Sequence, residues 1–169
     1  MPTSVESDQQ RELLILDTGP IRELVAFHAV DRFGFEALRN DLRFIKDEDS
    51  YKTCGQFIGL FRRKTTSASV VAELNCWIRD RRAGQERLWN RVYEEFRNMG
   101  MDEEAVKLLD MDLGLVAKFG PVDVSLFELA RRYAKQKACV LTIDKALQGE
   151  CKKAGLPVFL VQEVALMLR

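Results

Sequence analysis

Two short apolar runs, each closed by an aspartate, constrain the fold of this chain most strongly. Leu13-Leu14-Ile15-Leu16 ends at Asp17, and Ala138-Cys139-Val140-Leu141-Thr142-Ile143 ends at Asp144. A continuous apolar run of about four to eight residues, closed by turn residues, is typical of a strand buried on both faces. Such strands belong to parallel sheets, in which helices usually make the crossovers. We therefore expect an α/β protein, a three-layer α/β/α fold with a central, mostly parallel sheet.

Helical periodicity fills most of the chain between these strands. The expected helices are Pro20 to His28, Glu36–Ile45, Ser69–Arg82, Glu86–Asn98, Leu113–Lys118, Val124–Lys137, a helix from Asp144 to Lys153, and a terminal helix from Gln162. Further strands are expected at Val106–Leu109 and Val158–Val161, with a charged loop at Lys46–Tyr51. Thr65, Thr66 and Ser67 offer N-caps for the helix that follows them.

A single domain accounts for the whole sequence. The chain has 169 residues, with a polar start that predicts a flexible N-terminus over residues 1–10 and one domain over residues 11–169. A hydrophobic share of 47% excludes intrinsic disorder as the main state. The start has no apolar core of a secretory signal, and no apolar run reaches the ~18–20 residues of a membrane span. We therefore expect a cytoplasmic protein without membrane contact, whose four cysteines are buried free thiols.

Charge and histidine content limit the possible chemistry. Lys plus Arg total 26 and Asp plus Glu total 26, so the formal net charge is zero and bulk charge indicates no nucleic-acid partner. The lone histidine, His28, excludes sites that need a histidine pair, and we expect it to pack along its helix. Trp77 and Trp89 are expected to fill the core or a dimer surface rather than to stack on bases.

Four acidic residues stand where a parallel α/β sheet binds ligands. Asp17 and Asp144 follow strands, Asp123 opens a late helix, and Glu73 lies on the helix after a basic cluster. If the sheet brings these carboxylates together, their repulsion favours protonation or a bound cation, and oxygen ligands suit Mg²⁺ or Mn²⁺. The alternative for each aspartate is a helix N-cap, and for Glu73 a solvated helix position.

Four segments carry these acids in a fixed order: Leu13–Thr18, Val70–Leu74, Gly120–Leu126 and Leu141–Asp144. Together they resemble the PIN-domain ribonucleases, including the VapC-like toxins. In that family an acid closes the first strand, a V-x-E-L-type helix carries a Glu, an Asp opens a helix, and a T-x-D segment carries the last acid. The resemblance spans roughly residues 12–163 and implies a PIN-like domain that hydrolyses RNA with a divalent metal.

The resemblance also implies roles for individual residues. The implied catalytic residues and Mg²⁺ or Mn²⁺ ligands are Asp17, Glu73, Asp123 and Asp144, supported by Thr18 and Thr142. Three departures from the family pattern stand out. The chain between the first two acids is longer than in compact toxins, which predicts a helical insertion around residues 36–66. Gln148 replaces a further acid of some members, which leaves the number of metals open, and Val122 replaces a small polar residue.

The implied reaction is metal-assisted phosphodiester hydrolysis. The cation polarises a phosphoryl oxygen and lowers the pKa of a bound water that attacks in line, so no protein nucleophile is needed. An acidic pocket repels phosphates, so cations must flank it. Arg62, Arg63 and Lys64 precede the Glu73 helix by a short turn, and we expect them to bind the RNA backbone.

Two hypotheses about function follow. The first is a metal-dependent endoribonuclease, either the toxin of a toxin–antitoxin pair or a stand-alone RNA-processing enzyme. Its partners would be RNA, an antitoxin protein in the toxin case, and a second copy of the chain in a homodimer. The alternative is a catalytically inactive PIN-like module whose binding of RNA or protein does not respond to divalent cations. Gathered acids with basic clusters around them would reconcile a zero net charge with an RNA partner.

Overall fold

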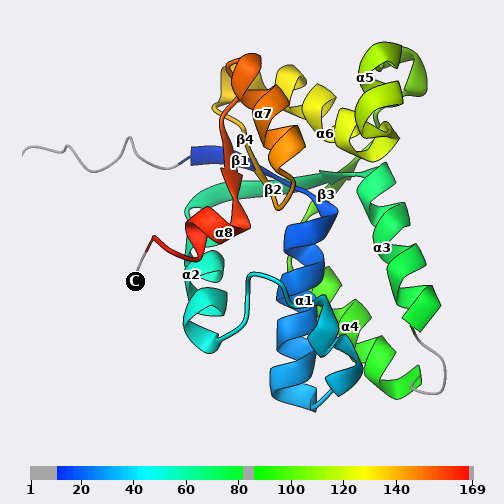
Figure 1. Ribbon diagram of the computed structural model, residues 1–169, viewed down its shortest axis with the longest axis vertical. Coiled ribbons are helices and arrows are strands. Elements are labelled where there is room, and N and C mark those ends of the chain that lie inside the picture. The colour runs from blue at the N-terminus through cyan, green and yellow to red at the C-terminus, as the bar shows by residue number, and fades with distance from the viewer. Residues whose placement is uncertain (1–10, 82–85, 168–169) are drawn as a thin grey trace, which may run out of the picture.

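All strands of the described chain run parallel in one five-stranded sheet of order β3-β2-β1-β4-β5 (Figure 1). The computed structural model describes residues 11–81 and 86–167, so the flexible N-terminus predicted at 1–10 lies outside the described residues. The strands are β1 Arg11–Leu16, β2 Phe61–Ser67, β3 Asp102–Glu104, β4 Cys139–Thr142 and β5 Val158–Leu160.

The helices alternate with these strands along the chain. The α-helices are α1 Thr18–Phe33, α2 Glu48–Gly59, α3 Ala68–Arg81, α4 Glu86–Asn98, α5 Leu113–Phe119, α6 Pro121–Arg132, α7 Lys145–Lys153 and α8 Val161–Val164. Short 3₁₀ helices are η1 Glu36–Asp41, η2 Leu108–Asp110 and η3 Ala134–Gln136. None of the helices in the described ranges has the length and apolar content that a bilayer crossing requires.

Helices cover both faces of the sheet, which confirms the predicted three-layer α/β/α fold. α5, α6 and α7 lie on one side of the sheet, and α1, α2 and α4 lie on the other (Figure 1). α6 contacts β1, β2 and β4, whereas α1 contacts β4 and α2 contacts β2. α3 contacts α1, α6 and β2, so it connects the two helical layers.

The strand order creates a switch point between β1 and β4. From β1 the chain continues outward to β2 and β3, and it then crosses to β4 and β5 on the other side. Leu14 of β1 pairs with Lys64 of β2 and with Cys139 of β4, so β1 is the central strand. Open parallel sheets bind ligands beyond the carboxyl ends of the strands at such a point.

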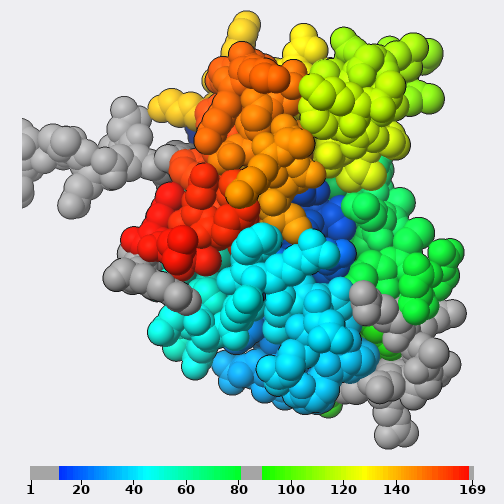
Figure 2. Space-filling view, in the orientation of Figure 1, coloured from blue at the N-terminus to red at the C-terminus, as the bar shows by residue number. Residues whose placement is uncertain are grey.

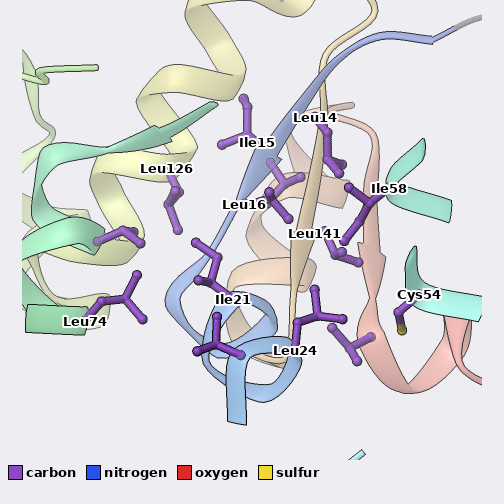
Figure 3. Close-up of a cluster of buried hydrophobic side chains, with 14 of the residues drawn as sticks. Leu14, Ile15, Leu16, Ile21, Leu24, Cys54, Ile58, Leu74, Leu126 and Leu141 are labelled. Atoms are coloured by element: carbon purple, nitrogen blue, oxygen red, sulfur yellow. The ribbon is translucent and has the colours of Figure 1, made fainter. Parts of the chain in front are cut away.

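The core is built around β1, as its apolar run predicts. Leu13 to Leu16 are all 0% exposed, with Leu126 of α6 on one side of the strand and Ile21 and Leu24 of α1 on the other (Figure 3). Full burial of one such side chain stabilises the fold by ~1.5–3 kcal/mol. The tryptophan prediction is confirmed for core packing, because Trp77 and Trp89 are buried and meet edge to face.

The cysteine prediction is confirmed in three of four positions. Cys54, Cys139 and Cys151 are buried free thiols, whereas Cys76 is free but exposed on α3.

Residues 36–66 differ from the predicted elements. The helix predicted at Glu36–Ile45 is limited to the short η1, and the predicted charged loop contains the start of α2. A capping box explains this start: the Asp47 carboxylate accepts from the Ser50 N–H at 2.8 Å, and the Asp47 N–H donates to the Ser50 hydroxyl at 3.2 Å. The segment also contains most of β2, which pairs with β1. That this segment is an insertion stays a prediction.

β2 and β3 were not predicted from the sequence at their observed positions. Arg62, Arg63 and Lys64 lie within β2 and not in a turn, since the strand continues to Ser67. The strand predicted at Val106–Leu109 is wrong, because the edge strand β3 lies at Asp102–Glu104 and Leu109 is 95% exposed. A three-residue polar edge strand carries no apolar alternation, so its sequence gives no strand signal.

Candidate functional site

Asp17 lies at the switch point, directly after β1. Its Oδ1 accepts a hydrogen bond from the Thr18 N–H at 2.6 Å, which caps α1, and its Oδ2 accepts from the Thr142 hydroxyl at 2.6 Å. The residue is only 6% exposed. The N-cap alternative is therefore correct for Asp17, and the second oxygen also ties this carboxylate to the end of β4.

The end of β4 brings Asp144 to the same region. The Thr142 hydroxyl accepts from the Asp144 N–H at 2.9 Å, so one threonine joins both aspartates. Asp144 caps α7, because its Oδ1 accepts from the N–H groups of Ala146 at 2.6 Å and Leu147 at 3.1 Å. Its Oδ2 accepts no hydrogen bond from the described residues and remains available to a ligand.

Glu73 reaches this region from α3. It is exposed, and its carboxylate accepts a hydrogen bond from the Thr18 hydroxyl, which connects the first turn of α1 to α3. α3 continues directly from β2, and of the three predicted capping residues only Ser67 acts as one, accepting from the Val70 N–H at 3.2 Å. Thr65 and Thr66 belong to the strand.

Asp123 lies in the first turn of α6 and is partly buried. α6 starts after Gly120, whose φ of 85° favours glycine, and Pro121 opens the helix. The helix therefore begins and ends earlier than the predicted Val124–Lys137, at Pro121 and Arg132. The alternative that Asp123 caps it is wrong, because Gly120 is the N-cap residue.

A pair of buried hydroxyls, to which the sequence analysis assigned no role in the site, fixes this first turn. The Ser125 Oγ lies 2.7 Å from the Ser67 Oγ and 2.6 Å from the Val122 carbonyl oxygen. This contact joins α6 to the end of β2, and it therefore positions Asp123. The signal available was the hydroxyl run that ends at Ser67, which indicated only helix capping.

The four carboxylates lie close enough to repel one another. Burial raises the pKa of Asp17 from 3.8 to about 6, and Glu73 and Asp144 add to this increase against the hydrogen bonds from Thr142 and Thr18. Burial also raises the pKa of Asp123 from 3.8 to about 7, with further contributions from the negative charges of Asp17, Asp144 and Glu73. The structure thus brings together all four acids that the sequence singled out.

The surroundings of the acids are visible in Figure 2. Blue atoms from the β1–α1 segment reach the surface between α7 in orange and α3 in green. The four acids offer carboxylate oxygens as metal ligands, and two threonine hydroxyls lie beside them. Such oxygen ligands fit Mg²⁺ or Mn²⁺. Among the described residues, no three His, Cys, Asp or Glu side chains stand in a ready-made metal-binding arrangement.

The predicted basic cluster of Arg62, Arg63 and Lys64 does not contact the four acids within the described part of the chain. Arg62 and Arg63 are exposed on β2, and the Arg63 Nη2 lies 3.8 Å from the Asp102 Oδ2 at the sheet edge. Lys64 is partly buried and lines a cavity with His28 and other residues. No contact between described residues joins the cluster to the four acids, so its role in RNA binding stays a prediction.

Gln148, one of the three departures from the family pattern, is a buried residue of α7. Its Nε2 donates to both carboxylate oxygens of Glu163, at 3.2 and 3.1 Å, and so links α7 to α8.

No protein-family model matches this chain, and no curated protein is similar to it in sequence. The motif order and the geometry of the acids therefore carry the functional argument without support from a relative.

Proposed function

We propose that this chain is a divalent-metal-dependent endoribonuclease of the PIN-domain type. The observation that carries the proposal is the hydrogen-bond network at the switch point, in which Thr142 joins Asp17 to Asp144 and Thr18 joins α1 to Glu73. Burial, with the nearby negative charges, also raises the pKa of Asp17 and Asp123. Carboxylates with strongly perturbed pKa values cluster at functional sites. Their hydrogen-bond donors are neutral hydroxyl and N–H groups, so the negative charge is left for a cation to neutralise.

Each residue has a distinct task in this proposal. The proposed ligands of Mg²⁺ or Mn²⁺ are Asp17, Glu73, Asp123 and Asp144. A bound divalent cation supplies the charge that polarises a phosphoryl oxygen and acidifies a water molecule. Thr142 holds the Asp17 carboxylate and the backbone before Asp144 in one orientation, and Thr18 holds Glu73. Such hydrogen bonds restrict the carboxylates before a ligand arrives.

The finer elements of the proposal derive from the motif resemblance. They are RNA as the substrate, Arg62 and Arg63 as backbone contacts, a homodimer, a cytoplasmic location and, for a toxin, an antitoxin protein as partner. Lys64 belongs to the same predicted set of backbone contacts, although it is partly buried and lines a cavity.

The test is cleavage of single-stranded RNA by the purified chain. We expect cleavage in Mn²⁺, none in EDTA, and a loss of at least ~100-fold in Asp17→Asn, because this substitution removes one ligand charge. Asp112→Asn is the matched control, since Asp112 also caps a helix, α5, by accepting from the Leu115 N–H at 3.0 Å. Cleavage that survives EDTA or Asp17→Asn would refute the proposal. RNA binding without cleavage, and indifferent to Mn²⁺, would identify the inactive binding module instead.

A further inference from the structure

A second polar region lies on the face of the sheet that α1, α2 and α4 cover. A cavity of about 260 Å³ opens between these helices and Lys64 of β2. Its apolar lining comes from Leu24, Val25, Ile58 and Met99. Its polar lining comes from His28, Tyr51, Lys52, Lys64, Glu95 and Asn98. Since His28 follows Asp17 by eleven residues, it lies about 16 Å from the acids along α1.

One wall of the cavity is fixed by aromatic contacts. The Tyr51 ring stacks on Phe27 with a centroid distance of 4.9 Å, and the His28 ring meets Phe33 edge to face at 5.4 Å. The His28 Nδ1 lies 3.3 Å from the Tyr51 hydroxyl, and its Nε2 lies 3.3 Å from the Glu95 Oε1. A ligand would therefore meet side chains that are already ordered, which lowers the entropy lost on binding.

Three formally charged side chains line the cavity: Lys52, Lys64 and Glu95. Glu95 contacts His28, and the Lys52 Nζ lies 2.9 Å from the Glu48 Oε1 on the exposed side of α2. Lys64 is partly buried, and no carboxylate of the described residues lies within ion-pair distance of its ammonium group. An ammonium group at the cavity wall without a carboxylate partner can form an ion pair with an anionic ligand.

We propose that this cavity binds a small organic anion. Lys64 would hold its carboxylate or phosphate group, Asn98 would donate a further hydrogen bond, and Ile58 and Met99 would contact an apolar body of about one ring. The cavity is smaller than the ~300–1,000 Å³ of drug-sized pockets, so the ligand is a metabolite-sized molecule and not a polymer. This inference is independent of the proposed nuclease activity, because it uses neither the four acids nor a metal.

The test compares three probes of similar shape in calorimetric titrations of the full chain with EDTA present. Benzoate carries a carboxylate, phenyl phosphate carries a phosphate, and benzamide is neutral. We expect saturable binding of at least one anion with Kd of about 1 mM or below, and at least ~10-fold weaker binding of benzamide. The tighter of the two anions identifies the headgroup.

Matched variants assign the binding to Lys64. Lys64→Met keeps the aliphatic stem and is expected to weaken anion binding at least ~10-fold, whereas Lys52→Met, at a paired and exposed lysine, should change it by less than ~2-fold. Lys64→Arg keeps the charge and should retain binding. If Lys64→Met fails to fold, the salt dependence of the unaltered chain replaces it, because binding through one ion pair weakens as NaCl is raised.

Three results would overturn this inference: no saturable binding of either anion up to ~10 mM, benzamide bound as tightly as benzoate, or binding unchanged in folded Lys64→Met. The Asp17→Asn variant is expected to bind the anion like the unaltered chain. Failure of the nuclease assay therefore leaves this inference intact, and failure of the titration leaves the nuclease proposal intact.

Discussion

The two ends of α1 carry polar regions of opposite kinds. At its first turn, Asp17 lies among three other acids, and the hydrogen bonds that hold it come from neutral groups. Near its last turns, His28 contacts Glu95, and the described residues place no carboxylate within ion-pair distance of the Lys64 ammonium group at the cavity wall. One region therefore has an excess of negative charge, whereas the other combines cationic and anionic side chains.

The difference has a consequence for stability. A carboxylate whose pKa is raised in the folded state destabilises that state at neutral pH, because the unfolded chain ionises more readily. Asp17 and Asp123 both have this property, so each makes the folded chain less stable at neutral pH than a carboxylate with an ordinary pKa would. The His28–Glu95 contact, in contrast, is partly exposed, so it changes the free energy of unfolding little.

The largest expected effect is on catalysis. Asp123→Asn removes one of the four proposed ligand charges, so we expect the initial rate of RNA cleavage in Mn²⁺ to fall at least ~100-fold. A rate within ~3-fold of the unaltered chain would mean that Asp123 belongs to the structure and not to the chemistry.

Removal of the shared hydroxyl should lower stability. Thr142 is fully buried and donates to Asp17, so Thr142→Val leaves a buried carboxylate oxygen unpaired and should cost about 1–3 kcal/mol in urea unfolding at pH 8. Thr53→Val is the control, since Thr53 is also buried but forms no side-chain hydrogen bond with the described residues. Equal effects of the two variants would contradict the special position of Thr142.

Neutralisation of an acid should, by contrast, raise stability at high pH. The pKa of Asp123 is about 7 in the folded chain against 3.8 ordinarily, so the folded state loses stability relative to the unfolded state as pH rises from about 4 to 7. Asp123→Asn escapes this loss. Its gain over the unaltered chain should grow from pH 4.5 to pH 8 and reach about 1–2 kcal/mol, after allowance for solvent screening. A gain that is absent at pH 8, or larger at pH 4.5, would contradict the repulsion among the acids.

The smallest effect is expected in the cavity. Glu95→Gln removes the carboxylate that contacts His28, and because both side chains are partly exposed the free energy of unfolding should fall by less than ~1 kcal/mol. The sign is opposite to that of Asp123→Asn at pH 8. A stabilising Glu95→Gln would show that the cavity is also strained by its charge, and the contrast between the two ends of α1 would disappear.

The sequence predicted those parts of the fold that local patterns specify. The continuous apolar runs before Asp17 and Asp144 correctly predicted β1 and β4. These two strands were enough to predict the layer architecture and the strand-end positions of Asp17 and Asp144. β2 was missed because its exposed residues, Arg62 and Arg63, are charged, and β3 because Asp102–Glu104 has no apolar residue at all. Both strands are specified by pairing with a neighbour, which no local pattern records.

Convergence of distant residues was harder to predict. Glu73 and Asp123 approach the strand-end acids through α3 and α6, and in the sequence this approach rested on the expected sheet topology and on the motif resemblance. The contact of Ser125 with Ser67 and the cavity that joins His28, Tyr51, Lys64 and Glu95 had no sequence signal, because their members are separated by more than a dozen residues and have ordinary residue types. Such groupings exist only in the folded chain.

A calorimetric titration with Mn²⁺ tests the central claim most directly. If the four acids form a cation site, the unaltered chain should bind Mn²⁺ saturably, Asp17→Asn and Asp144→Asn should lose that binding, and the helix-cap control Asp112→Asn should keep it. Absence of saturable Mn²⁺ binding in the unaltered chain, or binding by Asp17→Asn with the same affinity, would contradict the account.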